Sequence, residues 1–137
     1  MQKTAMTSLF SIAVSGLNNA TLRLSNAASN IVNASSTSKL PSSPNAPYTG
    51  FTPQDVISLS TGAAGVTSAL QPRTPAYQAV PDATSSNANS SGLVATPNVD
   101  LNSELIASKE AQVSYAANAK LIKVGEEMEK TLLDAIG

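Results

Sequence analysis

The chain has 137 residues, 8 basic and 9 acidic side chains, and a formal net charge of -1, which suits a single ordinary domain. It contains no Cys, His or Trp, so disulfide bonds, His- or Cys-ligated metal sites, and Ser-His-Asp or Cys-His catalysis are excluded. The few charges are scattered along the chain, without the basic patch that phosphate backbones require, so we expect no nucleic-acid partner.

Ala is the commonest apolar residue of the chain. Ala alone contributes 21 residues, so the chain can bury only a thin core, and we expect low stability as an isolated monomer. No stretch approaches roughly 20 apolar residues, so no insertion into a membrane is expected. Ser11 and Ser15 interrupt the apolar run near the N-terminus, and we therefore expect no cleaved signal peptide.

The first predicted element is a helix over residues 4–33. Its apolar residues recur at alternating spacings of three and four, as in a helix that packs lengthwise on other helices. This heptad stripe consists of Phe10, Ala13, Leu17, Ala20, Leu24, Ala27 and Ile31. Asn30 and Asn33 lie where the helix must end, and their amides can bond exposed backbone carbonyls or tolerate a left-handed conformation. We hypothesise that they fix the direction in which the chain leaves the helix.

The middle segment, residues 34–99, contains all eight prolines. Residues 35–47 are predicted to form an extended loop. Residues 56–59 and 66–70 are short strand candidates separated by a glycine-containing turn over 61–65, which predicts a small hairpin. Residues 72–98 are rich in Pro, Ala, Ser and Asn and have little to bury, so we expect low-complexity chain that lies along a neighbouring molecule.

The last predicted element is a helix over residues 100–136, with Asp100 as its N-cap. Its apolar residues recur at spacings of four, four and three, a pattern that keeps a helix almost straight. The apolar stripe of this helix consists of Val113, Ala117, Leu121, Val124, Met128, Leu132 and Ala135.

These elements predict a mainly α fold. Two long terminal helices, within segments 1–33 and 100–137, are expected to pack as an antiparallel coiled-coil-like pair around the hairpin-containing segment 34–99. Two interpretations remain open on composition alone. The chain is either an ordinary helical hairpin with a long insertion or a subunit of a helical polymer, whose small residues permit close approach of helices.

The sequence offers no convergent set of catalytic groups, and we expect neither enzymatic activity nor a cofactor. Ser36 and Lys39 match the S-x-x-K spacing of some serine enzymes, but the partner motifs of those enzymes are missing and Pro41 disfavours a helix there. Acidic residues of the last helix alternate with Lys123 and Lys130, as expected of a solvated helix face rather than a metal site.

Two sets of residues carry a resemblance to a known family. Near the end of the first helix stand Asn30, Ile31, Asn33 and Ser36, with Val32 where the family has Ala and Ser36 where it has Thr. Before and within the last helix stand Pro97, Asn98, Val99, Asp100, Tyr115 and Asn118. Together these residues resemble the terminal motifs of flagellar basal-body rod proteins, and most closely those of proximal rod subunits.

The resemblance implies a structural role in the bacterial flagellum. A rod subunit of this family is exported unfolded by the flagellar type III apparatus without a cleaved signal, and polymerises into the periplasmic rod that carries torque from motor to hook. The terminal helices are expected to line the export channel, and the partners to be other copies of the chain and other rod subunits. The competing hypothesis is a secreted helical-hairpin adaptor, or chaperone-like protein, that binds one partner reversibly.

Overall fold

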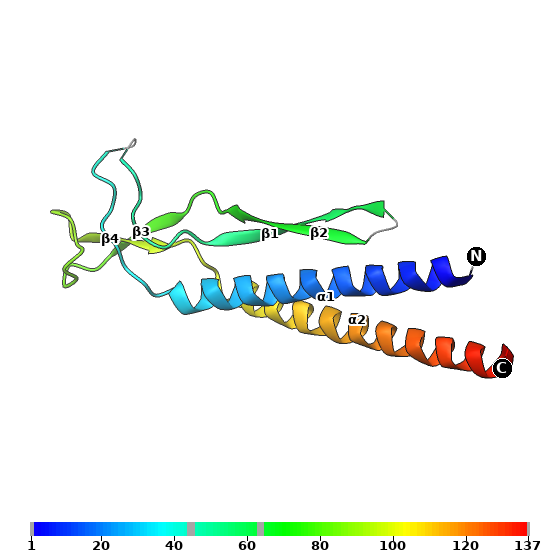
Figure 1. Cartoon of the computed structure of the whole chain (residues 1–137). Coiled ribbons are helices and arrows are strands. Elements are labelled where there is room, and N and C mark those ends of the chain that lie inside the picture. Colours follow the sequence, from blue (N-terminus) through cyan, green and yellow to red (C-terminus); the bar gives the residue numbers. More distant parts are fainter. Residues whose placement is uncertain (1, 44–45, 63–64, 137) are drawn as a thin grey trace.

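The computed structural model describes residues 2–43, 46–62 and 65–136. Two long helices, α1 (Gln2–Asn33) and α2 (Leu101–Ile136), are connected by four short strands. The helices lie side by side and run antiparallel, so that both chain ends lie at the same end of the molecule (Figure 1). The two predicted terminal helices are thereby confirmed, with bounds within two residues of those expected.

The start of α2 has the predicted cap. The Asp100 carboxylate accepts hydrogen bonds from the backbone N–H groups of Asn102 and Ser103, at 2.9 and 3.4 Å, and from the Ser103 hydroxyl at 3.1 Å. An N-cap side chain satisfies backbone donors that have no partner within the helix, so Asp100 fixes where α2 begins.

The first hairpin is also confirmed. Strand β1 (Gln54–Ser60) pairs antiparallel with β2 (Val66–Pro72), with Gln54 opposite Pro72 and Ser60 opposite Val66. Gly62 and Gly65 flank the turn with positive φ values of 68° and 97°, a backbone conformation that suits glycine. The predicted turn residues 63 and 64 lie outside the described residues. The hairpin extends along α1 on the side away from α2 (Figure 1).

The low-complexity expectation for residues 72–98 is wrong, because a second antiparallel hairpin forms there. Strand β3 (Tyr77–Pro81) pairs with β4 (Leu93–Pro97), and Val94 and Ala95 become fully buried. The average composition of residues 72–98 concealed their apolar side chains, which lie toward the two ends of this stretch. Strand pairing brings them together. The predicted loop adds to the packing through a bridge from Ser38 to Ala95, and Tyr48, directly after that loop, stacks on Tyr77.

The core between the two helices consists of small side chains. Ala13, Ala20 and Ala27 of α1 and Ala111 of α2 are at most 1% exposed. Alanine permits close approach but buries little area, so the contact between the helices stabilises the monomer only modestly. Within the described residues, neither helix is long and apolar enough to cross a membrane.

Candidate assembly surfaces and the polar junction between the helices

The heptad stripe of α1 faces inward only in part. Its three alanines are fully buried, whereas Phe10, Leu17 and Ile31 are half-buried and Leu24 is 36% exposed. Since residues seven apart in a helix lie on one face, the alanines form the line of closest approach, and the larger side chains lie beside it. The exposed parts of these larger side chains are therefore available for contact with another molecule.

Two glycines show how closely the helices approach. A Cβ atom on Gly16 would lie 2.4 Å from Oδ1 of Asn118 in α2, and one on Gly125 would lie 3.1 Å from the ring of Phe10 in α1. Gly125, which costs about 1 kcal/mol in helix propensity, thus makes room for an aromatic ring. Asn118 also donates to the Ser114 carbonyl at 2.8 Å, which holds its amide against Gly16.

The apolar stripe predicted for the last helix lies on α2, and we call it the α2 stripe. It lies mostly on the surface of the monomer. Val113 is 70% exposed, Val124 48% and Met128 58%, and Ala117, Leu121 and Ala135 are also exposed, while Leu132 is half-buried. Among the α2 residues whose burial the structure describes, the buried ones are instead Glu104, Ala111 and Gly125. They lie on another face of the helix, since each residue is rotated by about 100° from the one before it.

The exposed apolar surface extends toward the start of α2. Ile106 is 60% exposed and, together with Leu105 and Val113, lines a shallow apolar hollow whose edge includes Lys109 and Glu110. Apolar side chains gathered on one helix face are typical of a surface that contacts another molecule. The α2 stripe therefore remains a candidate assembly surface.

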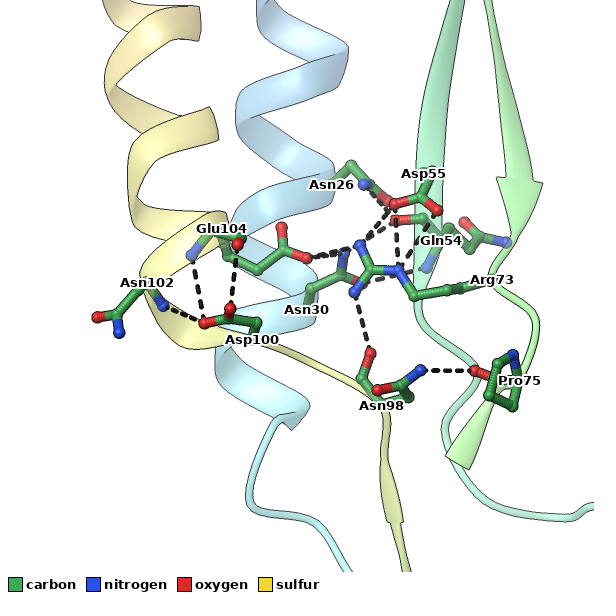
Figure 2. Close-up of polar contacts among 11 residues, drawn as sticks. Asn26, Asn30, Gln54, Asp55, Arg73, Pro75, Asn98, Asp100, Asn102 and Glu104 are labelled. Atoms are coloured by element: carbon green, nitrogen blue, oxygen red, sulfur yellow. Dashed lines mark hydrogen bonds and ion pairs between the residues drawn. The ribbon is translucent and has the colours of Figure 1, made fainter. Parts of the chain in front are cut away.

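A polar junction lies where both helices meet the base of the first hairpin (Figure 2). Asn30 of α1 is 1% exposed; its amide donates to the Gln54 carbonyl at 2.9 Å and to the Glu104 carboxylate at 3.0 Å, and its Oδ1 accepts from the Gln54 N–H at 3.2 Å. Asn26, one turn earlier, donates to the same Gln54 carbonyl at 2.7 Å. Asn30 thus binds α1 to β1 and α2 at once.

Arg73 completes this junction from the end of β2. Its guanidinium donates to Glu104 at 2.9 Å, to the Asn98 carbonyl at 3.0 Å, and to Asp55 through two nitrogens. The hydrogen bonds to Asp55, and after them those to Glu104, raise the pKa of Arg73 against the opposing effect of burial, so the side chain stays charged. The Glu104 carboxylate, 4% exposed, has both Arg73 and Asn30 as partners, as a buried charge requires.

The structure shows the expected bond to a helix carbonyl for Asn33 and different partners for Asn30, while their role in setting the direction of the chain stays a prediction. The Asn33 amide donates to the Ser29 carbonyl at 2.8 Å and so caps the end of α1, as expected. Asn30 instead bonds other elements. The left-handed alternative is wrong for both, because only glycines have positive φ among the residues that the structure describes.

Most other motif residues lie at the ends of elements. The Ser36 hydroxyl donates to the Asn33 carbonyl at 2.8 Å, and the Asn98 amide donates to the Pro75 carbonyl at 3.1 Å. Pro97 is buried at the end of β4, and the Val99 N–H donates to its carbonyl at 2.9 Å. Tyr115 differs, being 49% exposed on α2. The motif therefore mainly fixes how the chain enters and leaves the helices.

Sequence reasoning missed Arg73, Asp55 and the buried role of Glu104. One signal was present, because Arg73 is the only basic residue between Lys39 and Lys109. A lone cation in a polar, proline-rich segment is a candidate for a specific ion pair. Its two partners, one near in sequence and one in α2, could not be chosen without the fold.

Comparison with protein families gives a match to the second half of this arrangement. The family model described as Flagellar basal body rod FlgEFG protein C-terminal matches residues 90–135, which contain β4 and nearly all of α2. Over these residues the chain is similar to the C-terminal region of flagellar basal-body rod proteins. That family is a structural component of the flagellum, not a family of enzymes. No curated protein sequence matches the chain.

The match agrees with the general expectation from the terminal motifs. Over the matched residues it agrees with the coarser part of that expectation, a likeness to flagellar rod and hook proteins. The matched residues include Pro97, Asn98, Asp100 and Glu104. The matched region therefore contributes both the α2 cap and the α2 side of the polar junction.

Proposed function

We propose that this chain is a structural subunit of the proximal rod, most like flagellar basal-body rod protein C. In this proposal the chain polymerises with copies of itself and with other rod subunits into a helical assembly in the periplasm. The assembly lines the export channel and transmits torque from motor to hook. The subunit reaches the rod through the flagellar type III export apparatus, without a cleaved signal peptide.

The observation that carries the proposal is the exposed α2 stripe inside the family match. Val113 and Met128 lie within residues 90–135 and are exposed by more than half, although they belong to a regular apolar pattern along the helix. Burying a side chain of this size is worth about 1.5–3 kcal/mol. A helical polymer supplies that burial, because each copy can cover the stripe of the next.

The contacts of α1 support the same arrangement. Leu17 and Leu24 flank the buried alanine line and retain exposed surface. With the α2 stripe they give each subunit apolar contacts beyond its own helix pair. We propose that the coiled-coil-like packing expected from the heptad pattern forms in the assembly, between helices of neighbouring copies.

An electron-microscopy map of purified basal bodies tests this function. The expected result is density for α1 and α2 of this chain in the rod next to the export apparatus, with Val113 and Met128 against a neighbouring subunit. Finding the chain at the hook, or outside the rod, would contradict the proximal-rod assignment. Reversible binding of one soluble partner, with no incorporation into basal bodies, would favour the adaptor.

A further inference from the structure

A cleft opens between the two helices and the base of the β1–β2 hairpin, beside the polar junction. Its volume is about 250 Å³, which is smaller than the pockets of about 300–1,000 Å³ that hold drug-sized ligands. The cleft therefore suits a single extended side chain or an equally small molecule. The charged residues in its wall are Arg23, Asp55, Arg73 and Glu104.

Within the part of the chain that the structure describes, one oxygen of the buried Glu104 carboxylate lacks a hydrogen-bond donor. Its Oε1 accepts from both Arg73 and Asn30. In Figure 2 the other oxygen, Oε2, points away from Arg73. Oε2 is not completely enclosed by protein atoms, and Glu104 lines the cleft. Since buried polar atoms are normally hydrogen-bonded, the cleft is suited to a ligand that donates hydrogen bonds.

The charges around the cleft favour a cation. Asp55 and Glu104 both accept from the same nitrogen of Arg73, Nη2, so two carboxylates lie close together and share one guanidinium. Arg23 adds little positive charge, because it is already paired with Glu110 at 2.9 Å. An anion would meet two carboxylates at short range, and like charges in a partly buried site repel one another more strongly than in water.

We propose that this cleft binds a primary ammonium group, which donates hydrogen bonds to Glu104 Oε2 and to the Asp55 carboxylate. Such a group combines a positive charge with three N–H donors, so one bound group satisfies the buried oxygen and balances the second carboxylate. A metal ion fits less well, because no set of three acidic side chains that could hold one is found among the described residues.

Lysine side chains of a neighbouring copy are the source of ammonium groups that the chain itself offers. Four lysines of α2 are exposed, and none of them belongs to an ion pair within the described residues: Lys109, Lys120, Lys123 and Lys130. This choice of source rests on the proposed rod function, whereas the ammonium site itself does not. A free amine from solution is the other source with the same chemistry.

A titration of the dilute, isotope-labelled chain with n-butylammonium chloride tests the site. The backbone amides of Val56 and Glu104, two residues that line the cleft, should show saturable shifts in NMR spectra. Sodium chloride at equal ionic strength and uncharged n-butanol should leave both amides unchanged, since neither supplies an ammonium group. No saturable shift with n-butylammonium, or a larger response to sodium acetate, would overturn the site.

Variants link the binding to the charges of the cleft. Glu104→Gln should weaken n-butylammonium binding about tenfold or more, the factor for the loss of a hydrogen bond to a charged group. Glu127→Gln makes the same change at an exposed position of α2 outside the cleft, and this matched control should bind as the wild type does. Arg23→Met removes a positive charge from the wall and should strengthen binding about twofold to fivefold, a gain that partial unfolding cannot produce. Equal affinities of the wild type and Glu104→Gln, or no gain in Arg23→Met, would contradict the assignment.

Cross-linking of purified basal bodies with a carbodiimide identifies the source, because this reagent joins a carboxylate to an amine in direct contact. The Asp55 side chain is 54% exposed, so the reagent reaches it. We expect a peptide containing Asp55 linked to a lysine of α2 in basal bodies but not in the dilute monomer. If the monomer binds n-butylammonium and basal bodies show no such link, the lysine source is wrong and a free amine occupies the cleft. Absence of the chain from basal bodies would refute the proposed function, and the titration would still decide the site.

Discussion

The Asn30 amide and the Glu104 carboxylate meet at 3.0 Å between the two helices, where both side chains are almost completely buried. The two residues are 74 positions apart in sequence, and the hydrogen bond joins the last turns of α1 to the first turn of α2. Because the rest of the helix contact consists largely of alanine and glycine, this pair is the main polar contact that sets how the helices align.

Asn30→Ala should lower the free energy of unfolding by about 2–4 kcal/mol, because the substitution removes the three hydrogen bonds that the buried Asn30 side chain makes to Gln54 and Glu104. Chemical denaturation followed by circular dichroism measures the change. Asn33→Ala is the matched control, since that amide only caps the exposed end of α1, and it should cost about 0.5–1 kcal/mol. Equal losses for the two variants would show that Asn30 acts only as a helix-end residue.

Arg73→Met should cost about 3 kcal/mol, at the lower end for a broken buried pair because 24% of the Arg73 side chain is exposed. Adding Glu104→Leu should recover part of the loss, since the unpaired buried carboxylate is then removed. The partly exposed pair of Arg23 and Glu110 is the control, and Arg23→Met should cost at most about 1 kcal/mol. Strictly additive losses for Arg73→Met and Glu104→Leu would mean that the pair contributes no coupling.

The Asp100 cap should make stability depend on pH in acid. Hydrogen bonds from the Ser103 and Asn102 backbones, and then from the Ser103 hydroxyl, lower the pKa of Asp100 from its ordinary value of 3.8. The unfolded chain therefore binds a proton more readily, so stability rises with pH in this range. The contribution is fully present above the unfolded pKa and is lost as pH falls through the lower folded one.

Asp100→Asn tests this pH dependence, because asparagine keeps the cap without a titrating group. Urea denaturation from pH 6 down to pH 2 should show the wild-type chain losing its advantage over Asp100→Asn below about pH 4. A difference between the two chains that stays constant across this range would contradict the assigned role of the carboxylate.

Local sequence patterns predicted the elements whose conformation is decided by residues close to one another in the sequence. The α2 cap at Asp100, the two long helices and the hairpin around Gly62 and Gly65 could be read from the sequence because neighbouring residues decide them. The second hairpin could not be predicted, because the extended conformation of residues such as Tyr77 and Leu93 is stabilised only when their strands pair. The junction of Arg73 with Glu104 was also hidden, since tertiary contacts alone choose between possible ion-pair partners. The α2 stripe was recognised as a pattern, but its spacing could not tell which face of α2 the monomer buries.

Gly16→Ala should destabilise the chain although alanine is the better helix former by about 1 kcal/mol. The added Cβ would lie 2.4 Å from Asn118 Oδ1, so the amide or the helix must shift. We expect a net loss of about 1 kcal/mol or more in the free energy of unfolding. In an Asn118→Ala background the same substitution should become neutral or stabilising. A stabilising Gly16→Ala in the wild-type background would show that the helices do not approach so closely at this point.

Val113→Asp separates assembly from folding. Because Val113 is 70% exposed, the free energy of unfolding of the monomer should change by no more than about 0.5 kcal/mol. In the proposed rod the same carboxylate would be buried without a partner, at a cost of several kcal/mol per contact, so incorporation into basal bodies and swimming should be lost. Gln112→Asp places the same charge at the adjacent exposed position outside the α2 stripe and should leave both incorporation and swimming intact.

Secretion of Val113→Asp through the export apparatus should continue, since an unfolded chain does not use the stripe. Normal swimming of Val113→Asp would remove the stripe from the assembly surface, and an unstable monomer would show that Val113 packs within its own chain.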